Sequence, residues 1–356
     1  MITRREWLLA SSAFAAALTM APRSGFAQGA KTLKVGFGQK AISPNLINLL
    51  IGETLGYNAT EGFKVQGMAL GGNNNVQVAT DRGDVDVGIG VPSTALPILS
   101  KGEWGGAVNF YEYTYPYKWD IAVKKGAAIK SYTELKGKNI GVSDFAGTEF
   151  PVTKNVLRSL GLDPEKDVKW TAVGNGIPAG VALDRGAIDA LAYYDTGFGQ
   201  IEAAGMAIDM LPRPDKLPMI GGQFLMAQRA RIDADRALFI GYGRSVAKAS
   251  VFLLANPTAG AQAFLKMYPE TAPRGSTAEQ AVKSVIEAIS RRIKLYEPPY
   301  QGTKMGAIRE EEFATEAQMN GWDIKDFSKI YTNDLIEEIN KFDAEQIRAQ
   351  ARAYVG

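Results

Sequence analysis

The chain has 356 residues, of which 46% are hydrophobic, and this suits a soluble protein with two domains, each with its own core. It contains no cysteine and no histidine, which excludes disulfide bonds, the common zinc and copper sites, and Ser-His or Cys-His catalysis. The formal net charge is +2, and residues 1–27 carry the same excess through Arg4, Arg5 and Arg23 against Glu6. The rest of the chain is therefore neutral, so we expect no nucleic-acid partner.

The first 27 residues have the pattern of an export signal. Two arginines precede an apolar run over residues 8–20 that is too short to span a bilayer, and Gly25-Phe-Ala27 supplies a small-x-small cleavage site. The arginine pair, followed by Trp7-Leu8-Leu9, favours the twin-arginine route, and a general secretory signal is the alternative. Because no lipobox cysteine is present, we expect a soluble periplasmic protein that is not lipid-anchored.

The next elements alternate between strands and helices. Alternating apolar residues predict strands over residues 31–37, 63–70, 108–115 and 119–123. Ser43-Pro44 is typical of a helix start, with Ser43 as the N-cap, and residues 92–99 predict a second helix. Aromatic residues alternate along the strand that follows and its continuation, at Tyr111, Tyr113, Tyr115, Tyr117 and Trp119. Such a row can pack in the core between the domains or stack on a flat ligand.

Two stretches of the chain are nearly the same. Residues 79–86 (Ala-Thr-Asp-Arg-Gly-Asp-Val-Asp) and 182–189 (Ala-Leu-Asp-Arg-Gly-Ala-Ile-Asp) each follow a Gly-rich turn and lead into an apolar run. Each predicts a short helix, a glycine in the left-handed conformation that ends it, and a buried strand. The pair predicts two similar α/β lobes with a cleft between them.

The second lobe continues with strands predicted over residues 139–143, 169–173 and 208–211, and with a helix that begins at Thr148. Pro116 marks the first crossing between lobes, and the Pro-rich stretch over residues 212–218 marks the return. From Ile232 onward the pattern is mainly helical, with Ser276 and Glu279 predicting a capping box. We expect these helices to pack on the first lobe, and a dimerising appendage is the alternative.

The order of several phrases resembles periplasmic solute-binding proteins of ABC importers, in the nitrate/sulfonate/taurine and thiamine-precursor-like group. The phrases are Leu33-Lys-Val-Gly-Phe37, Glu61-Gly-Phe-Lys-Val65, the two Arg-Gly-x-[Val/Ile]-Asp units and Leu135-Lys-Gly-Lys-Asn-Ile-Gly-Val142. The resemblance implies a periplasmic binding protein type II-like α/β fold, with mixed sheets flanked by helices in two lobes. It suggests a first lobe of residues 28–117 and 222–356, and a second lobe of residues 118–221.

Ligands of open α/β sheets sit beyond the carboxyl ends of the strands, where this chain has several loops and helix starts that favour anions. For each Ser or Thr there, an ordinary N-cap is the alternative role. Tyr194 and Asp195 end the strand of the second repeat, where the family places binding groups, and Phe224 would close the pocket. The candidate ligand-binding residues are Gln39, Ser43, Asn73, Asn74, Ser93, Thr94, Tyr115, Phe145, Thr148, Tyr194, Asp195 and Phe224.

The charged residues near the predicted site do not identify the chemical class of the ligand. Helix starts favour an anion, but Asp144, Glu149 and Asp195 gather near the expected mouth and no arginine lies in the predicted loops. A sulfonate, a carboxylate, a zwitterion, an aminopyrimidine-like heterocycle and an aromatic acid therefore all stay possible.

The family implies a protein that captures a small organic molecule between its lobes and delivers it to a membrane permease with its ATPase subunits. We expect a monomer without a catalytic residue, cofactor or metal ion. A periplasmic sensor for a signalling receptor is the first alternative. An enzyme on the same fold is the second, although the histidine and cysteine chemistries of relatives have no counterpart in this chain.

Overall fold

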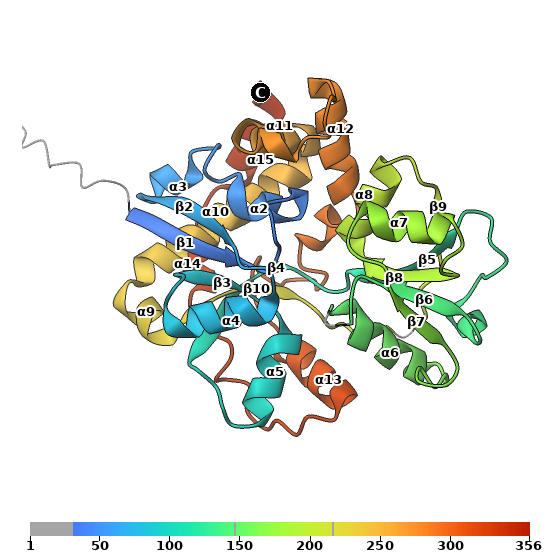
Figure 1. Ribbon diagram of the computed structural model, residues 1–356. Coiled ribbons are helices and arrows are strands. Elements are labelled where there is room, and N and C mark those ends of the chain that lie inside the picture. The colour runs from blue at the N-terminus through green and yellow to red at the C-terminus, as the bar shows by residue number, and fades with distance from the viewer. Residues whose placement is uncertain (1–30, 146, 216) are drawn as a thin grey trace, which may run out of the picture. The chain divides into compact units, whose positions relative to one another are not determined.

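The computed structural model describes residues 31–145, 147–215 and 217–356, and the export signal predicted over residues 1–27 lies outside them. The compact unit from Thr32 to Gly356 contains two five-stranded sheets, each flanked by helices (Figure 1). Each sheet has parallel and antiparallel neighbours, which confirms the predicted α/β class with mixed sheets. The lobe boundaries at residues 117/118 and 221/222 stay predictions.

The first sheet has the strand order β2-β1-β3-β10-β4. Its strands are β1 (Lys31–Phe37), β2 (Phe63–Ala69), β3 (Val87–Gly90), β4 (Ala107–Thr114) and β10 (Gln223–Gln228). Strand β1 runs parallel to β3, and β10 runs antiparallel to both β3 and β4. Strand β10 was not predicted, because it is almost wholly buried between two neighbours and its residues do not alternate between apolar and polar.

The second sheet has the order β7-β6-β8-β5-β9. Its strands are β5 (Trp119–Lys124), β6 (Asn139–Val142), β7 (Lys169–Ala172), β8 (Ala190–Tyr194) and β9 (Ile208–Met210). The chain leaves the first sheet after β4 and returns to it at β10, so the two predicted crossings lie where the sequence analysis expected them.

The internal repeat is confirmed in both sheets. Helix α4 (Asn73–Arg82) precedes β3, and helix α7 (Ile177–Asp184) precedes β8, each helix being followed by a glycine of positive φ. The last aspartate of each repeat makes the same hydrogen bond to the backbone of a neighbouring strand. Asp86 accepts a hydrogen bond from the backbone N–H of Lys34 at 2.7 Å, and Asp189 accepts one from that of Asn139 at 2.8 Å. The repeat therefore ties its own strand to the neighbouring parallel strand.

Helices cover both sheets and fill the C-terminal third of the chain. The capping box of the helix over Ala278–Ile289 uses Thr277 and Gln280. The expected pair Ser276 and Glu279 was therefore one residue early, because the helix begins at Ala278. The longer helices not yet named are α5 (Pro92–Ser100), α6 (Glu149–Ser159), α8 (Asp195–Ala203), α9 (Arg229–Ala234), α10 (Arg236–Ala255), α11 (Pro257–Met267), α12 (Ala278–Ile289), α13 (Glu310–Asn320) and α15 (Ala344–Ala353). The short ones are η1 (Pro44–Leu46), α2 (Ile47–Leu50), α3 (Tyr57–Thr60), η2 (Tyr132–Leu135), η3 (Pro269–Thr271), η4 (Ile293–Leu295) and α14 (Ile336–Ile339).

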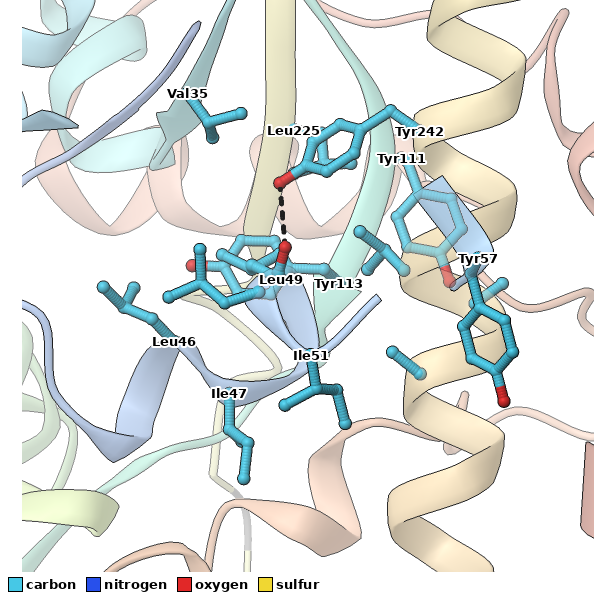
Figure 2. Close-up of a cluster of buried hydrophobic side chains, with 14 of the residues drawn as sticks. Val35, Leu46, Ile47, Leu49, Ile51, Tyr57, Tyr111, Tyr113, Leu225 and Tyr242 are labelled. Atoms are coloured by element: carbon cyan, nitrogen blue, oxygen red, sulfur yellow. Dashed lines mark hydrogen bonds between the residues drawn. The ribbon is translucent and has the colours of Figure 1, made fainter. Parts of the chain in front are cut away.

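The largest apolar core lies between the first sheet and the C-terminal helices. Figure 2 shows its centre, where the Tyr242 hydroxyl of α10 donates to the carbonyl of Leu49 at 3.3 Å. Helix α10 is long and apolar enough to cross a membrane, but most of it is buried in this core. The alternating aromatic residues over 111–119 are also buried. The four tyrosines serve packing, whereas Trp119 also reaches the cavity described below.

Candidate functional site

A cavity of about 530 Å³ opens beyond the carboxyl ends of β1, β2, β6 and β8, and loops of both sheets line it. This is the place where open α/β sheets bind ligands. Its wall is strongly polar and contains Gly38, Gln39, Lys40, Ser43, Asn45, Gly71, Gly72, Asn73, Lys118, Trp119, Ser143, Asp144, Gly147, Thr148, Glu149, Asn175, Tyr194, Thr196, Gln200, Gln223 and Arg292.

Three predicted residues line the cavity from the first sheet. Gln39 follows β1, and its side-chain oxygen is buried without a hydrogen-bond partner among the described residues. The Ser43 hydroxyl donates to the side-chain oxygen of Asn45 at the start of η1, so Ser43 does not cap the backbone there. Asn73 opens α4, whose first N–H groups follow Gly72 in the cavity wall. Residues 73–75 form the first turn of this helix.

From the second sheet, Thr148 and Glu149 line the cavity at the start of α6. The Glu149 carboxylate accepts a hydrogen bond from the Ser143 backbone N–H at 2.9 Å and another from the Ser143 hydroxyl. Burial raises the pKa of Glu149, although these hydrogen bonds oppose the shift. Tyr194 completes this wall, and its hydroxyl donates to Asn175 at 3.3 Å.

The N-terminus of α8 brings Thr196 to the cavity wall, whereas the predicted binding residue Asp195 is not part of that wall. Asp195 is its first residue and Thr196 its second. The Thr196 side chain lines the cavity and is 1% exposed, yet its hydroxyl has no hydrogen-bond partner among the residues that the structure describes. A buried hydroxyl without a partner is rare in native proteins, and a bound ligand at this cavity would supply the missing contact.

A buried ion pair lies at the start of α8, where Asp195 binds Arg292. Arg292 Nε donates to Asp195 Oδ2 at 2.5 Å, and Arg292 Nη2 donates to Oδ1 at 2.6 Å. Arg292 Nη1 also donates to Gln223 at 3.2 Å, and the guanidinium lines the cavity. Sequence reasoning missed Arg292, which follows α12 far from every predicted loop. The sequence did contain one signal. Arg292 lies three residues after Ile289, on the apolar face of the predicted helix, and an arginine on a buried face needs a carboxylate partner.

Lys118 is the second cation that the sequence analysis missed. It is buried in the first crossing, between β4 and β5, and its Nζ lies 4.8 Å from the centroid of the Trp119 ring. Burial and the Arg292 charge lower the pKa of Lys118 to about 7, while Asp195, Glu316 and Glu149 oppose the shift.

The remaining predicted residues lie elsewhere. Asn74 is exposed in α4, and Ser93 and Thr94 are half-buried in α5. Tyr115 is buried, and its hydroxyl accepts a hydrogen bond from the Gly306 backbone N–H at 2.7 Å. Phe145 is exposed and packs on Phe150 with ring centroids 5.2 Å apart. Phe224 is buried in β10 against Phe313, on the side of an apolar cluster. None of these side chains is in the cavity wall that the described residues form.

The charges at the cavity differ from those expected. Lys40, Lys118 and Arg292 line it together with Asp144 and Glu149. No arginine lies in the predicted loops, but the fold brings Arg292 to the cavity from the C-terminal region. Asp195 does not repel an anion as expected, since Arg292 neutralises it. In the described part of the chain no group of three or more Asp or Glu side chains is arranged to hold a metal ion.

Two mixed sheets with one cavity at the carboxyl ends of their parallel strands form the periplasmic binding protein fold, which solved structures share with this chain. The family model described as NMT1/THI5 like matches residues 43–260, more than half of the chain. The chain belongs to this family. No curated protein matches it.

Solved structures share the fold at low sequence identity. The alkanesulfonate-binding protein SsuA from Xanthomonas axonopodis pv. citri, bound to MOPS, is 17% identical with a TM-score of 0.57, and the match covers 86% of this chain and 97% of that protein. A putative periplasmic sulfonate-binding SsuA from Methylobacillus flagellatus KT is 15% identical with a TM-score of 0.60, over 88% and 94%. The desulfurization enzyme DSZB is 14% identical with a TM-score of 0.52, over 90% and 99%.

Proposed function

We propose that this chain is the extracytoplasmic substrate-binding component of an ABC importer, and that it captures a small organic anion, a sulfonate or a carboxylate, in the cavity between its sheets. The protein would then deliver that anion to a membrane permease and its ATPase subunits. Family membership supports the binding role, and the structural neighbours named for sulfonates support the ligand class.

The observation that carries the proposal is the set of donors that converge on one cavity. Lys40 and Lys118 supply positive charge, Arg292 supplies guanidinium N–H groups, and the Thr196 hydroxyl supplies an unused donor. The starts of α4, α6 and α8 add backbone N–H groups and the positive ends of three helix dipoles. An anion would gain from all of them at once, whereas a cation would be repelled by the same groups.

Binding from both sheets would also explain delivery. A ligand that touches Gln39 and Asn73 on one side and Thr148 and Thr196 on the other favours the conformation in which both sets are close. Export through the signal of residues 1–27 would bring the protein to the periplasm, where such a ligand and an importer meet.

The test is a thermal-shift screen of the purified protein against alkanesulfonates, short carboxylates, aromatic acids and aminopyrimidines. A ligand at 100 times its Kd stabilises the folded state by about 2.7 kcal/mol, which gives a clear rise in Tm. We expect alkanesulfonates or carboxylates to raise the Tm and uncharged aminopyrimidines to leave it unchanged. A shift with aminopyrimidines alone would contradict the anion assignment, and no shift with any compound would contradict the binding role.

The fold is shared with an enzyme, so the same samples must be checked for turnover. Each compound that raises the Tm is incubated with the protein and then recovered and quantified by mass spectrometry. Complete recovery of unchanged ligand is expected for a binding protein. A product that accumulates with time and protein concentration would replace the importer proposal by a catalytic one.

A further inference from the structure

The cavity wall contains one buried lysine whose charge has no counter-ion beside it. Lys118 is 6% exposed, and its Nζ lies over the Trp119 ring. No carboxylate oxygen of the described residues lies within 4.0 Å of this Nζ. The guanidinium of Arg292 lines the same cavity, but Asp195 already balances its charge. Lys118 is therefore the buried cation of the site whose charge is least compensated, whereas Lys40 in the same wall is exposed to solvent.

Five charged groups act on Lys118 from the elements packed around it. They are Arg292 after α12, Asp195 in α8, Glu149 in α6, Glu316 in α13 and Glu112 in β4. Burial and Arg292 lower the pKa of Lys118, the carboxylates raise it, and the result is about 7. Since an anion placed beside Nζ favours the ammonium form, binding must draw the proton onto the amine.

We propose that Lys118 makes ligand binding proton-linked: the anionic group and one proton from solvent enter the site together, and the proton is held on Lys118 Nζ. This inference rests on the proposed function and adds its regulation. The protein would bind its ligand more tightly on the acidic side of neutrality and release it more readily on the alkaline side, without any change in the rest of the cavity.

The competing proton acceptor is Glu316. Its carboxyl is also buried, and burial raises its pKa to about 7. The two residues give opposite predictions when each is changed. A guanidinium in place of the Lys118 amine would stay charged at every pH, so Lys118→Arg should remove the pH dependence of binding. Glu316→Gln removes a carboxylate that raises the pKa of Lys118, so the dependence should stay and move to lower pH.

The experiment is isothermal titration calorimetry of the full chain with ethanesulfonate and with propionate, neither of which titrates between pH 6 and 9. For the unmodified protein we expect a constant Kd at the acidic end and about a tenfold rise per pH unit above neutrality. At pH 8, repeating the titration in phosphate and in Tris buffer should reveal the uptake of about one proton per ligand. This arm needs no variant, so it decides the question even if Lys118→Arg does not fold.

A Kd that is constant from pH 6 to 9 would overturn the inference while leaving the proposed function intact. A dependence that survives in Lys118→Arg and disappears in Glu316→Gln would overturn it as well, because the proton would then reside on Glu316. No binding of either probe at any pH would contradict the proposed anion function, and with it this inference.

Discussion

Arg292 and Asp195 are 97 residues apart in the sequence and form a two-pronged ion pair at the wall of the cavity, with both nitrogen–oxygen distances at 2.6 Å or less. The pair joins α8 of the second sheet to the segment after α12, which packs on the first sheet. Both side chains are 4% exposed. This ion pair thus connects the two halves of the site and neutralises the charge of Asp195.

Removing one charge of this pair should destabilise the protein strongly. In Asp195→Asn the guanidinium of Arg292 stays buried without a counter-ion, and we expect a loss of about 3–5 kcal/mol in the free energy of unfolding. Urea denaturation measures it. The matched control is Asp120→Asn, whose partner Arg213 is bound by the same two-pronged geometry but is 47% exposed. The control should lose about 1 kcal/mol or less. Equal losses in both variants would contradict the role of burial.

The unpartnered hydroxyl of Thr196 should matter for ligand binding and not for folding. Thr196→Val keeps the shape and removes the hydroxyl, so the affinity for the anion should fall by about 1 kcal/mol, or roughly fivefold. Thr114 gives a matched control, because its hydroxyl is also buried and unpartnered among the described residues but lies outside the cavity wall. Calorimetry on Thr114→Val should find an unchanged Kd. A similar loss in both variants would show that Thr196 acts indirectly.

The buried carboxyl of Glu316 should make the protein less stable as the pH rises. Burial raises its pKa from 4.5 to about 7, so the folded state holds a proton between these values that the unfolded state has released. Its stabilising contribution is complete below pH 4.5 and is lost as the pH passes 7. The neutral side chain in Glu316→Gln does not ionise. The free energy of unfolding of this variant should therefore rise relative to that of the unmodified protein, by on the order of 3 kcal/mol between pH 5 and 8.

Chemical denaturation at several pH values measures this difference. Glu311→Gln on the same helix is the control, because the Glu311 side chain is 71% exposed and its pKa is lowered. The stability difference for that variant should not grow between pH 5 and 8. A flat difference for Glu316→Gln would mean that Glu316 is charged throughout this range.

Gly221 should not tolerate a side chain. It lies in the return crossing with φ of +81°, and a Cβ there would lie 1.8 Å from the ring of Trp119. We expect Gly221→Ala to cost more than about 3 kcal/mol in unfolding free energy, since conformational strain and a clash add. Gly126→Ala separates the two effects, because φ is +79° there and nothing lies within 4 Å of its Cβ. That control should cost about 1 kcal/mol. A similar cost for both would exclude the clash with Trp119.

The repeat shows why much of the fold could be predicted. Its glycines end the helices, its aspartates tie neighbouring strands, and its apolar runs become β3 and β8. All of these depend on residues close together in the chain, so local patterns contain the information. Strand β10 was missed for the opposite reason, since its neighbours β3 and β4 are distant in sequence and its burial on both faces hides the alternation.

The residues of the site also divide into those that local sequence patterns predict and those that they do not. Gln39, Ser43, Asn73, Thr148 and Tyr194 were found because each follows a strand or begins a helix, and such positions gather at one edge of a sheet. By itself the sequence thus determined the class of fold, the repeat and some of the loops that face the cavity, although Ser93, Thr94 and Phe145 do not reach it. Only the tertiary structure decided the charge of that cavity, because Arg292 and Lys118 reach it through long-range packing. The pKa values and ion pairs of buried groups depend on which distant residues surround them, and no local pattern encodes that.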